Sequence, residues 1–336
     1  MEHGDFCDLL IVGAGPTGLA CAIEAGKAGL RAIVVEKGCL VNSLFHYPAN
    51  MVFFTTSELL EIGGVPFTTA LAKPNRLEAL EYYRKVAAHF ALDTRLYERV
   101  EAIVPCNPSA PGFEVSSTRA DGSRGRYHAA AVVIATGYYD LPNLMGIPGE
   151  DLPHVRHYFQ EAHAFARQEV AIIGGKNFAA ETALDLYRHG ARVTLIHRQA
   201  ELASSIKYWV RPDIENRIKA GEIRARFRTR VLEILPGRLR LLTPEGEAEM
   251  RADFVFALTG YHPDFDFLRH AGVALDAASR PVCDPASYQT NVPGLYLGGV
   301  VVAGRNTSEI FIENGRFHGQ VIVAHILSQR AAAQLA

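Results

Sequence analysis

The feature that most constrains the fold is a glycine-rich turn near the start of the chain. Residues 8–12 have the character of a buried strand, Gly13, Gly15 and Gly18 follow as Gly-x-Gly-x-x-Gly, and residues 19–25 have helical spacing. Such glycines permit a tight turn, close approach of a pyrophosphate and close packing of the helix, whose first N–H groups attract anions. The stretch therefore predicts a dinucleotide-binding βαβ unit.

An acidic residue is expected about twenty positions further on, where it would accept hydrogen bonds from ribose hydroxyls. Glu36 ends the strand-like residues 32–36, with Lys37 beside it. We predict that both residues contact the bound dinucleotide, together with Pro16 and Thr17 inside the glycine motif.

The length and charge of the chain limit its architecture and its partners. Its 336 residues allow two domains of about 150 residues each. A net charge of −2 does not indicate a nucleic-acid or membrane partner. The first residues do not resemble a signal peptide, and no apolar run approaches the roughly 18 residues needed to span a bilayer. We expect a cytoplasmic protein without a metal site.

The glycine motif has a second copy later in the chain. Four positions of the first copy recur after a shift of 161 residues (174 − 13): Gly13 as Gly174, Gly18 as Ala179, Gly29 as Gly190, and Glu36 as His197. The sequence Ala-Thr-Gly-Tyr at 135–138 likewise recurs as Leu-Thr-Gly-Tyr at 258–261. Matches at a constant spacing indicate an internal repeat, so the chain is predicted to contain two dinucleotide-binding units.

The second copy differs where the ribose would bind. His197 and Arg198 replace the acidic residue, and a guanidinium can bind a 2′-phosphate that a carboxylate would repel. This favours NADPH in the second unit. The predicted NADPH residues are Gly174, Gly175, Lys176, Asn177, Ala179, His197, Arg198, Lys207 and Gly260. The pattern leaves open whether Lys176 points away or contacts the nicotinamide side, and Lys207 is either a phosphate ligand or a surface lysine.

The remaining segments show alternating strand and helix patterns. Residues 75–90 have the spacing of an amphipathic helix, residues 314–327 indicate a C-terminal helix, and short strands at 99–104, 112–118 and 126–135 indicate an antiparallel meander. Residues 40–67 form a long irregular segment, and a Pro/Gly-rich stretch at 140–150 indicates a linker. The arginines at 224, 226, 228 and 230 alternate with period two, which is typical of the solvated face of a strand.

Two different dinucleotide units suggest a bound FAD and a visiting NADPH that exchange a hydride. In order, the motifs resemble the two-dinucleotide-binding flavoproteins of thioredoxin-reductase type. Five segments resemble the bacillithiol-disulfide reductase family: residues 53–57, 137–139, 174–177, 260–264 and 311–319. The resemblance implies an α/β fold of two Rossmann-like, three-layer ββα domains. It places the NADPH domain (151–261) within a discontinuous FAD domain (1–150 and 262–336).

The resemblance implies NADPH-dependent reduction of the disulfide of a low-molecular-weight thiol, such as bacillithiol disulfide, by a homodimer or homotetramer. It adds residues near the flavin to the predicted FAD set: Thr136, Gly137, Gly299, Glu313, Asn314 and Gly315. Candidate catalytic residues are His46, His318 and Thr17, because histidines near a flavin can relay protons. A structural role for each histidine is the alternative.

Two departures affect the expected mechanism. The five cysteines contain no Cys-x-x-Cys pair, so electrons cannot pass through paired thiols as in thioredoxin reductase. Thr17 stands where members of the bacillithiol branch often carry a proposed redox cysteine. Three alternatives therefore stay open: electron transfer to a small carrier protein such as ferredoxin or flavodoxin, a flavin monooxygenase, and a non-catalytic redox sensor.

Overall fold

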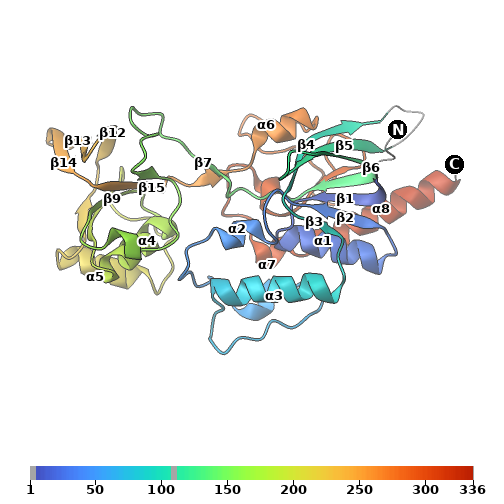
Figure 1. Ribbon diagram of the computed structural model, residues 1–336, viewed down its shortest axis with the longest axis horizontal. Coiled ribbons are helices and arrows are strands. Elements are labelled where there is room, and N and C mark those ends of the chain that lie inside the picture. Colours follow the sequence, from blue (N-terminus) through green and yellow to red (C-terminus); the bar gives the residue numbers. More distant parts are fainter. Residues whose placement is uncertain (1–4, 107–111, 336) are drawn as a thin grey trace. The chain divides into compact units, whose positions relative to one another are not determined.

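The computed structural model describes residues 5–106 and 112–335. The chain forms two compact units (Figure 1). Unit 1 contains the chain up to His46, Met51–Leu141 and the part from His262 onward, and unit 2 contains Tyr47–Asn50 and Pro142–Tyr261. Residues 142–150 therefore belong to the inserted unit, which the sequence places from 151 onward. The assignment of one cofactor to each unit stays a prediction.

Unit 1 is built on a seven-stranded sheet of order β3-β2-β1-β6-β5-β4, to which β17 adds by pairing with β6. Strands β1, β2, β3, β6 and β17 pair in parallel, and β4, β5 and β6 pair antiparallel. The strands are β1 (Asp5–Val12), β2 (Ala32–Val35), β3 (Thr94–Arg95), β4 (Glu98–Pro105), β5 (Phe113–Arg119), β6 (Arg124–Ile134) and β17 (Leu295–Leu297). The predicted meander is confirmed.

Helices cover this sheet because β1 buries apolar side chains on both of its faces. Leu10 and Val12 face the core that includes the meander, whereas Ile11 lies against the first turn of α1 (Pro16–Lys27). The other helices of unit 1 are α2 (Asn42–Phe45), η1 (Ser57–Leu60), α3 (Arg76–His89), α6 (Phe265–His270), η3 (Gly299–Ala303), α7 (Ile312–Gly315) and α8 (His318–Leu335). A capping box between Asn75 and Glu78 starts α3, which confirms the helix predicted at 75–90.

The C-terminal helix expected at 314–327 is wrong at its start. Residues 312–315 form a separate short helix, α7, which ends at Gly315. At its start, the Asn314 side chain accepts a hydrogen bond from the Phe311 backbone N–H at 2.8 Å. A new helix, α8, begins at His318. Asn314, the third residue of α7, accepts the N–H of the N-cap residue Phe311, which favours a helix start there. Gly315 favours a helix end, so the chain forms two helices where the apolar spacing predicts one.

Unit 2 has a five-stranded parallel sheet of order β11-β10-β9-β15-β8 and an antiparallel sheet of order β12-β13-β14. The first sheet contains β8 (Val155–Arg156), β9 (Glu169–Ile173), β10 (Arg192–Ile196), β11 (Arg224–Arg226) and β15 (Phe254–Ala257). The second contains β12 (Arg230–Leu235), β13 (Arg238–Thr243) and β14 (Gly246–Arg251). The helices are η2 (His163–Phe165), α4 (Asn177–Arg188) and α5 (Arg211–Lys219).

The side chains of β9 show that unit 2 has three layers. Val170 and Ile172 pack in the core beneath α4 and α5, and Ala171 and Ile173 pack in a second core against the β12–β14 sheet. The predicted α/β class, with one Rossmann-like unit inserted into another, is confirmed. Strands β7 (Leu141–Pro142) and β16 (Tyr261–His262) pair where the chain passes into and out of the insertion.

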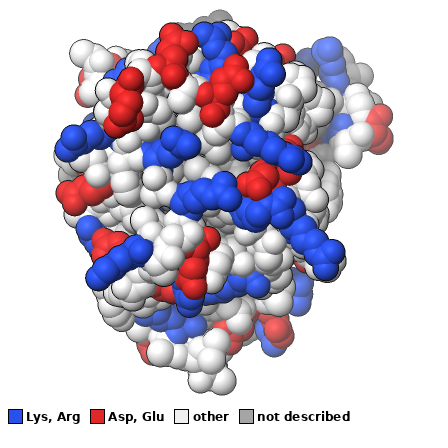
Figure 2. All heavy atoms as spheres, turned by 90° about the vertical axis from the view of Figure 1, so that its left-hand side faces the viewer, with Lys and Arg blue, Asp and Glu red and all other residues white. Residues whose placement is uncertain are grey.

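The arginine alternation lies on a solvated surface, as predicted. Arg224, Arg226, Arg228 and Arg230 are all exposed, but they belong to β11, the following turn and the start of β12 rather than to one strand. Figure 2 turns the left-hand side of Figure 1, with β12–β14, toward the viewer and shows basic and acidic side chains interspersed. Arg240 illustrates the mixture, because it pairs with Glu233 at 2.7 Å and Glu247 at 3.1 Å.

Candidate functional site

The first glycine turn has the geometry of a phosphate cradle. Gly13 has φ +107°, and a β-carbon there would come within 2.6 Å of the Ala135 backbone oxygen. A β-carbon at Gly18 would lie 1.9 Å from the Gly13 oxygen, so helix α1 needs this glycine to pack on β1. A β-carbon at Gly15 would meet no protein atom within 4 Å. Gly13 and Gly18 thus serve packing, and Gly15 leaves room for a ligand beside the start of α1.

The start of α1 favours an anion, and the Glu36 carboxylate beside the glycine turn favours a ribose. Gly15 is the N-cap of α1 and Pro16 follows it, so the first N–H groups of the helix are not capped by a side chain at that position. Glu36 is 7% exposed, and its two carboxylate oxygens accept from the Ala14 N–H at 2.8 Å and the Gly38 N–H at 2.9 Å. Burial raises the pKa of this carboxyl. Each oxygen retains a lone pair that can accept from a hydroxyl.

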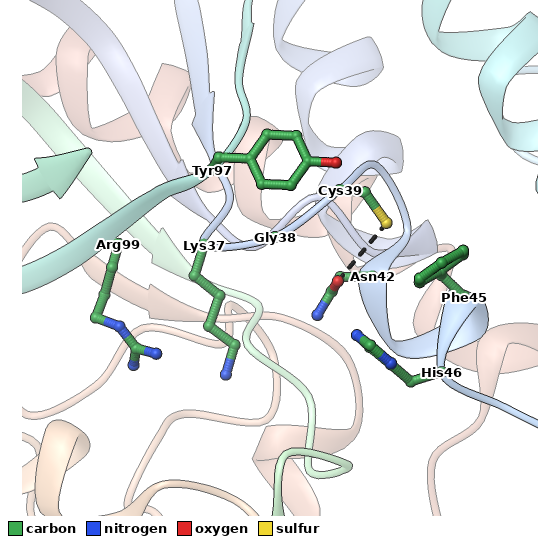
Figure 3. A pocket seen from close by; sticks show the side chains of 8 residues that line it. All are labelled: Lys37, Gly38, Cys39, Asn42, Phe45, His46, Tyr97 and Arg99. Atoms are coloured by element: carbon green, nitrogen blue, oxygen red, sulfur yellow. Dashed lines mark hydrogen bonds between the residues drawn. The ribbon is translucent and has the colours of Figure 1, made fainter. Parts of the chain in front are cut away.

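A cavity of about 420 Å³ opens beside Glu36 (Figure 3). In Figure 3 the cationic groups of Lys37 and Arg99 lie on one side, and the rings of Phe45 and His46 lie on the other. The Lys37 ammonium is 2.7 Å from the Asp140 carboxylate. The cavity is lined by Lys37, Gly38, Cys39, Asn42, Phe45, His46, Tyr97 and Arg99.

Most of these lining residues, unlike Lys37 and His46, are not predicted as site residues from the sequence. Tyr97 and Arg99 reach the cavity because the chain around them is bonded to the end of β2: the Tyr97 N–H donates to Gly38 at 3.0 Å and the Glu98 N–H to Glu36 at 2.8 Å. Their distance from Glu36 along the chain leaves no local sequence signal. Glu36 accepts a hydrogen bond from the N–H of Gly38, which lines the cavity, and binding of the adenosine half of a dinucleotide here stays a prediction.

Two further predicted FAD segments, η3 and α7, meet in unit 1 around the side chain of Thr17. A β-carbon at Gly299 would come within 2.9 Å of the Thr17 hydroxyl oxygen, and one at Gly315 within 3.1 Å. Thr17 is half-buried. The structure therefore brings the first turn of α1 together with η3 and α7.

His318 supports this cluster from behind. It is 4% exposed, its Nδ1 accepts the Gly299 N–H at 3.1 Å, and its ring stacks on Tyr288 with ring centres 4.0 Å apart. Burial lowers the pKa of His318 to about 4, so the ring is neutral at pH 7 and carries its proton on Nε2. A positioning role fits these contacts, and proton transfer by His318, His46 or Thr17 stays a prediction.

The remaining predicted FAD residues lie at the ends of elements of unit 1. Thr136 and Gly137 follow β6 and are half-buried, and a β-carbon at Gly137 would meet no protein atom within 4 Å. Glu313 is half-buried and lies in the first turn of α7. The Asn314 amide is engaged within its own turn, because it also donates to the Glu309 oxygen at 3.0 Å.

The second glycine turn repeats the first in unit 2. A β-carbon at Gly174 would come within 2.7 Å of the Leu258 oxygen and 3.0 Å of the Ala179 β-carbon. Lys176 is the exposed N-cap of α4, and an ammonium cannot cap helix N–H groups because it has no acceptor. The start of α4 can therefore hold a pyrophosphate as the start of α1 can. Gly260 is half-buried and follows β15.

His197 occupies the place of Glu36 but makes a different contact. A β-carbon at Gly175 would lie 2.4–2.5 Å from three atoms of the His197 ring. Gly175 thus makes room for the imidazole where the first unit has Ala14 beside a carboxylate. Burial and the neighbouring Arg198 lower the pKa of His197, which favours its neutral form. Arg198 is exposed and can reach an anion.

Asn177 and Lys207 are held by protein groups. The Asn177 amide donates to the Ser205 oxygen at 3.0 Å and accepts the Lys207 N–H at 2.8 Å. Lys207 is 7% exposed, and its ammonium lies 2.7 Å from the Glu181 carboxylate. It is therefore not a surface lysine, and a direct contact with NADPH stays a prediction.

The five cysteines do not form a disulfide. Burial raises the pKa of Cys7 and of Cys21 to about 12, and it also raises the pKa of Cys39 and of Cys283. These four thiols are therefore poor nucleophiles at neutral pH. Among residues 5–106 and 112–335, no group of three His, Cys, Asp or Glu side chains could hold a metal ion. No helix in that part of the chain is long and apolar enough to cross a bilayer.

Two glycine cradles, one beside a carboxylate and one beside an arginine, define a two-dinucleotide oxidoreductase. Residues 10–299 match the pyridine nucleotide-disulphide oxidoreductase family, and the chain belongs to that family. Its cofactors are FAD and NADPH, as predicted.

One curated relative and two solved structures show which proteins this chain is similar to. Bacilliredoxin reductase Bdr of Bacillus subtilis is 43% identical over 319 residues, which cover 94% of this chain and 96% of the relative. The structure of bacillithiol disulfide reductase Bdr from Bacillus cereus superposes with a TM-score of 0.94 at 43% identity, covering 97% of this chain and all of the other. Thioredoxin reductase of T. acidophilum shares the fold, with a TM-score of 0.74 at 22% identity and coverage of 97% and 99%. The predicted resemblance to the bacillithiol-disulfide reductases is confirmed.

Proposed function

We propose that this protein is an NADPH-dependent flavin reductase of a low-molecular-weight disulfide, with bacillithiol disulfide as the first candidate. The overall reaction is NADPH + H⁺ + RSSR → NADP⁺ + 2 RSH. The observation that carries the proposal is the 43% identity over nearly the whole of both chains to a bacilliredoxin reductase. Two cradles of different chemistry within one chain support it.

The chain's own residues would bind and orient the two dinucleotides. Glu36 and the cavity beside it suit the adenosine of FAD, the starts of α1 and α4 suit the two pyrophosphates, and Arg198 suits the 2′-phosphate of NADPH. When bound, FAD supplies the redox chemistry, because it takes a hydride from nicotinamide and passes two electrons on. His318 would hold the Gly299 backbone in place beside Thr17.

The chain has no Cys-x-x-Cys pair, so the disulfide would not be reduced through the paired thiols that thioredoxin reductase uses. Thr17 supplies a hydroxyl, which cannot form a mixed disulfide, at the position where the bacillithiol branch often carries cysteine. Five free cysteines also suit the reducing cytoplasm, where we place this protein as a homodimer or homotetramer. Sedimentation of the FAD-loaded protein would measure its oligomeric state.

The test is anaerobic NADPH consumption by the FAD-loaded protein on addition of bacillithiol disulfide. We expect multiple turnovers, with NADPH preferred over NADH, and two thiols formed for each NADPH oxidised. A bacilliredoxin carrying bacillithiol as a mixed disulfide is a second acceptor for the same experiment. Rates equal to the rate without acceptor for both compounds would contradict the proposal.

A second candidate is electron transfer to a small carrier protein. Ferredoxin–NADP reductase of Ignicoccus hospitalis is 26% identical over 303 residues, covering 87% of this chain and 89% of the relative, and the missing cysteine pair suits such a role. Ferredoxin reduction faster than disulfide reduction would favour this candidate over the first.

A further inference from the structure

The loop at residues 203–207 is hydrogen-bonded to Gly175, just before α4, and to Asn177, the first residue of α4. The Ala203 N–H donates to the Gly175 oxygen at 2.9 Å. The Asn177 side chain then donates to the Ser205 oxygen at 3.0 Å and accepts the Lys207 N–H at 2.8 Å. One asparagine, at the first position of α4, therefore fixes two backbone groups of the 203–207 loop.

An ion pair and a core residue secure the far end of the same loop. The Lys207 ammonium is 2.7 Å from the carboxylate of Glu181, which lies one helical turn after Asn177 on α4. The Lys207 side chain is 8% exposed. Ile206, between these contacts, is 4% exposed and packs in the core beneath α4. The residues that hold the loop thus point into unit 2, whereas Ser204 and Ser205 are exposed.

This arrangement separates two roles, holding the 203–207 loop in place and contacting NADPH, which sequence alone does not distinguish. Both Asn177 and Lys207 are predicted from the sequence to contact NADPH. In the structure, however, the Asn177 amide bonds the loop backbone and the Lys207 ammonium pairs with Glu181. What they leave available is the backbone N–H groups at the start of α4 together with the exposed hydroxyls of Ser204 and Ser205. A loop fixed in advance lowers the entropy lost when a nucleotide binds.

We propose that Asn177 is a positioning residue for NADPH, which holds the 203–207 loop against the first turn of α4 so that helix and loop form one preorganised cradle for the nucleotide. The Lys207–Glu181 ion pair is a second interaction that fastens the 203–207 loop to α4, and we call it the second fastening. This inference rests on the proposed function only in taking NADPH as the electron donor.

The experiment measures NADP⁺ affinity by calorimetry and amide hydrogen exchange of residues 203–207 in the FAD-loaded protein. Because Asn177→Ala removes two hydrogen bonds, we expect the Kd for NADP⁺ to rise at least about tenfold and the loop amides to exchange faster. The KM for NADPH should rise more than kcat falls. Asn216→Ala, an exposed asparagine on α5 of the same unit, is the matched control and should leave both quantities unchanged.

Glu181→Gln and Lys207→Met distinguish fastening from direct binding. If the pair fastens the loop, each substitution weakens NADP⁺ binding to a similar extent, and the double variant is no worse than either single one. If Lys207 instead binds a phosphate directly, Lys207→Met weakens binding while Glu181→Gln leaves it equal or tighter, and the second fastening is overturned.

The central inference has its own decisive result. Wild-type affinity and unchanged loop exchange in Asn177→Ala would overturn it, whatever the acceptor proves to be. None of these readouts uses a disulfide, so a failure of disulfide reduction would count against the proposed function alone.

Discussion

At the scale of the residue, three predicted site residues are engaged in contacts with the protein itself. His318 accepts a backbone N–H, Asn177 bonds both sides of a loop, and Lys207 pairs with Glu181. A sequence motif specifies which residue types stand at these positions, but it does not encode which way a side chain points. These contacts join residues 19 to 30 positions apart. They depend on how loops return over helix ends, and local sequence does not encode that.

The buried His318 gives a prediction about acid stability. Its pKa is about 4 in the folded protein, and an unfolded histidine titrates near 6.5. Between these pH values the unfolded chain binds a proton that the folded one does not. The free energy of unfolding should therefore fall on acidification from about pH 6.5 to pH 4, by up to roughly 3 kcal/mol from this residue.

Urea unfolding of wild type and His318→Asn at pH 7 and pH 5 measures this contribution. The asparagine oxygen can still accept the Gly299 N–H but does not titrate, so the variant should lose less stability than wild type between the two pH values. The comparison cancels the other histidines. An equal loss in both proteins would show that His318 titrates normally.

At the scale of the element, the strand–turn–helix units follow from sequence almost completely. The glycines, the apolar strands and the constant shift of 161 residues specify both cradles, and Asn75 with Glu78 specifies the start of α3. The cavity beside Glu36 was not predicted, because Tyr97 and Arg99 join it through hydrogen bonds between the β3–β4 turn and the end of β2. The split between α7 and α8 was missed because apolar spacing continues across it.

Gly15 and Gly18 should respond differently to the same added methyl group. Gly18→Ala places a carbon 1.9 Å from the Gly13 oxygen, so α1 must move away from β1 and stability should fall by roughly 1–3 kcal/mol. Gly15→Ala meets no protein atom within 4 Å. It should leave the FAD-free protein as stable as wild type and weaken FAD binding at least about tenfold.

Thermal unfolding of the FAD-free proteins and fluorescence titration with FAD test this pair. Gly26→Ala, elsewhere on α1 and also without neighbours within 4 Å, is the control for adding a methyl group to the helix. Equal FAD affinity in wild type and Gly15→Ala would mean that the pyrophosphate does not approach this turn.

At the scale of the whole molecule, one Rossmann-like unit is inserted into another, and each unit has a glycine turn at the start of a helix. The repeat in the sequence predicts this duplication, and the family confirms it. The exact division of the chain follows less easily, since residues 47–50 belong to unit 2 although they lie far from it in sequence. The Ala49 N–H donates to the Gln160 backbone oxygen at 2.8 Å, and no sequence motif predicts this contact.

An enzyme of this architecture without paired cysteines should resist thiol reagents. We expect the FAD-loaded protein, reduced by NADPH and treated with iodoacetamide, to keep its rate with its best acceptor. A thioredoxin reductase treated in the same way is the control and should lose activity, because its reduced cysteine pair is alkylated. Inactivation prevented by Cys39→Ser would instead give a role to the half-buried thiol beside the Glu36 cavity.

The contact between Gly175 and His197 has a consequence for how cofactor preference can be redesigned. The equivalent positions in the first unit are Ala14 and Glu36, so the small residue and the residue at the strand end exchange volume as a pair. Gly175→Ala alone should destabilise the protein, because the added carbon would overlap the imidazole. Adding His197→Glu should restore stability, with a coupling energy of about 0.5–3 kcal/mol in a double-mutant cycle. Additive effects would show the two positions to be independent. If the effects are instead coupled, Gly175→Ala inherited without His197→Glu is penalised, because the added carbon would overlap the imidazole. A route from one nucleotide to another avoids that barrier only if the codon for residue 197 changes first or both codons change together.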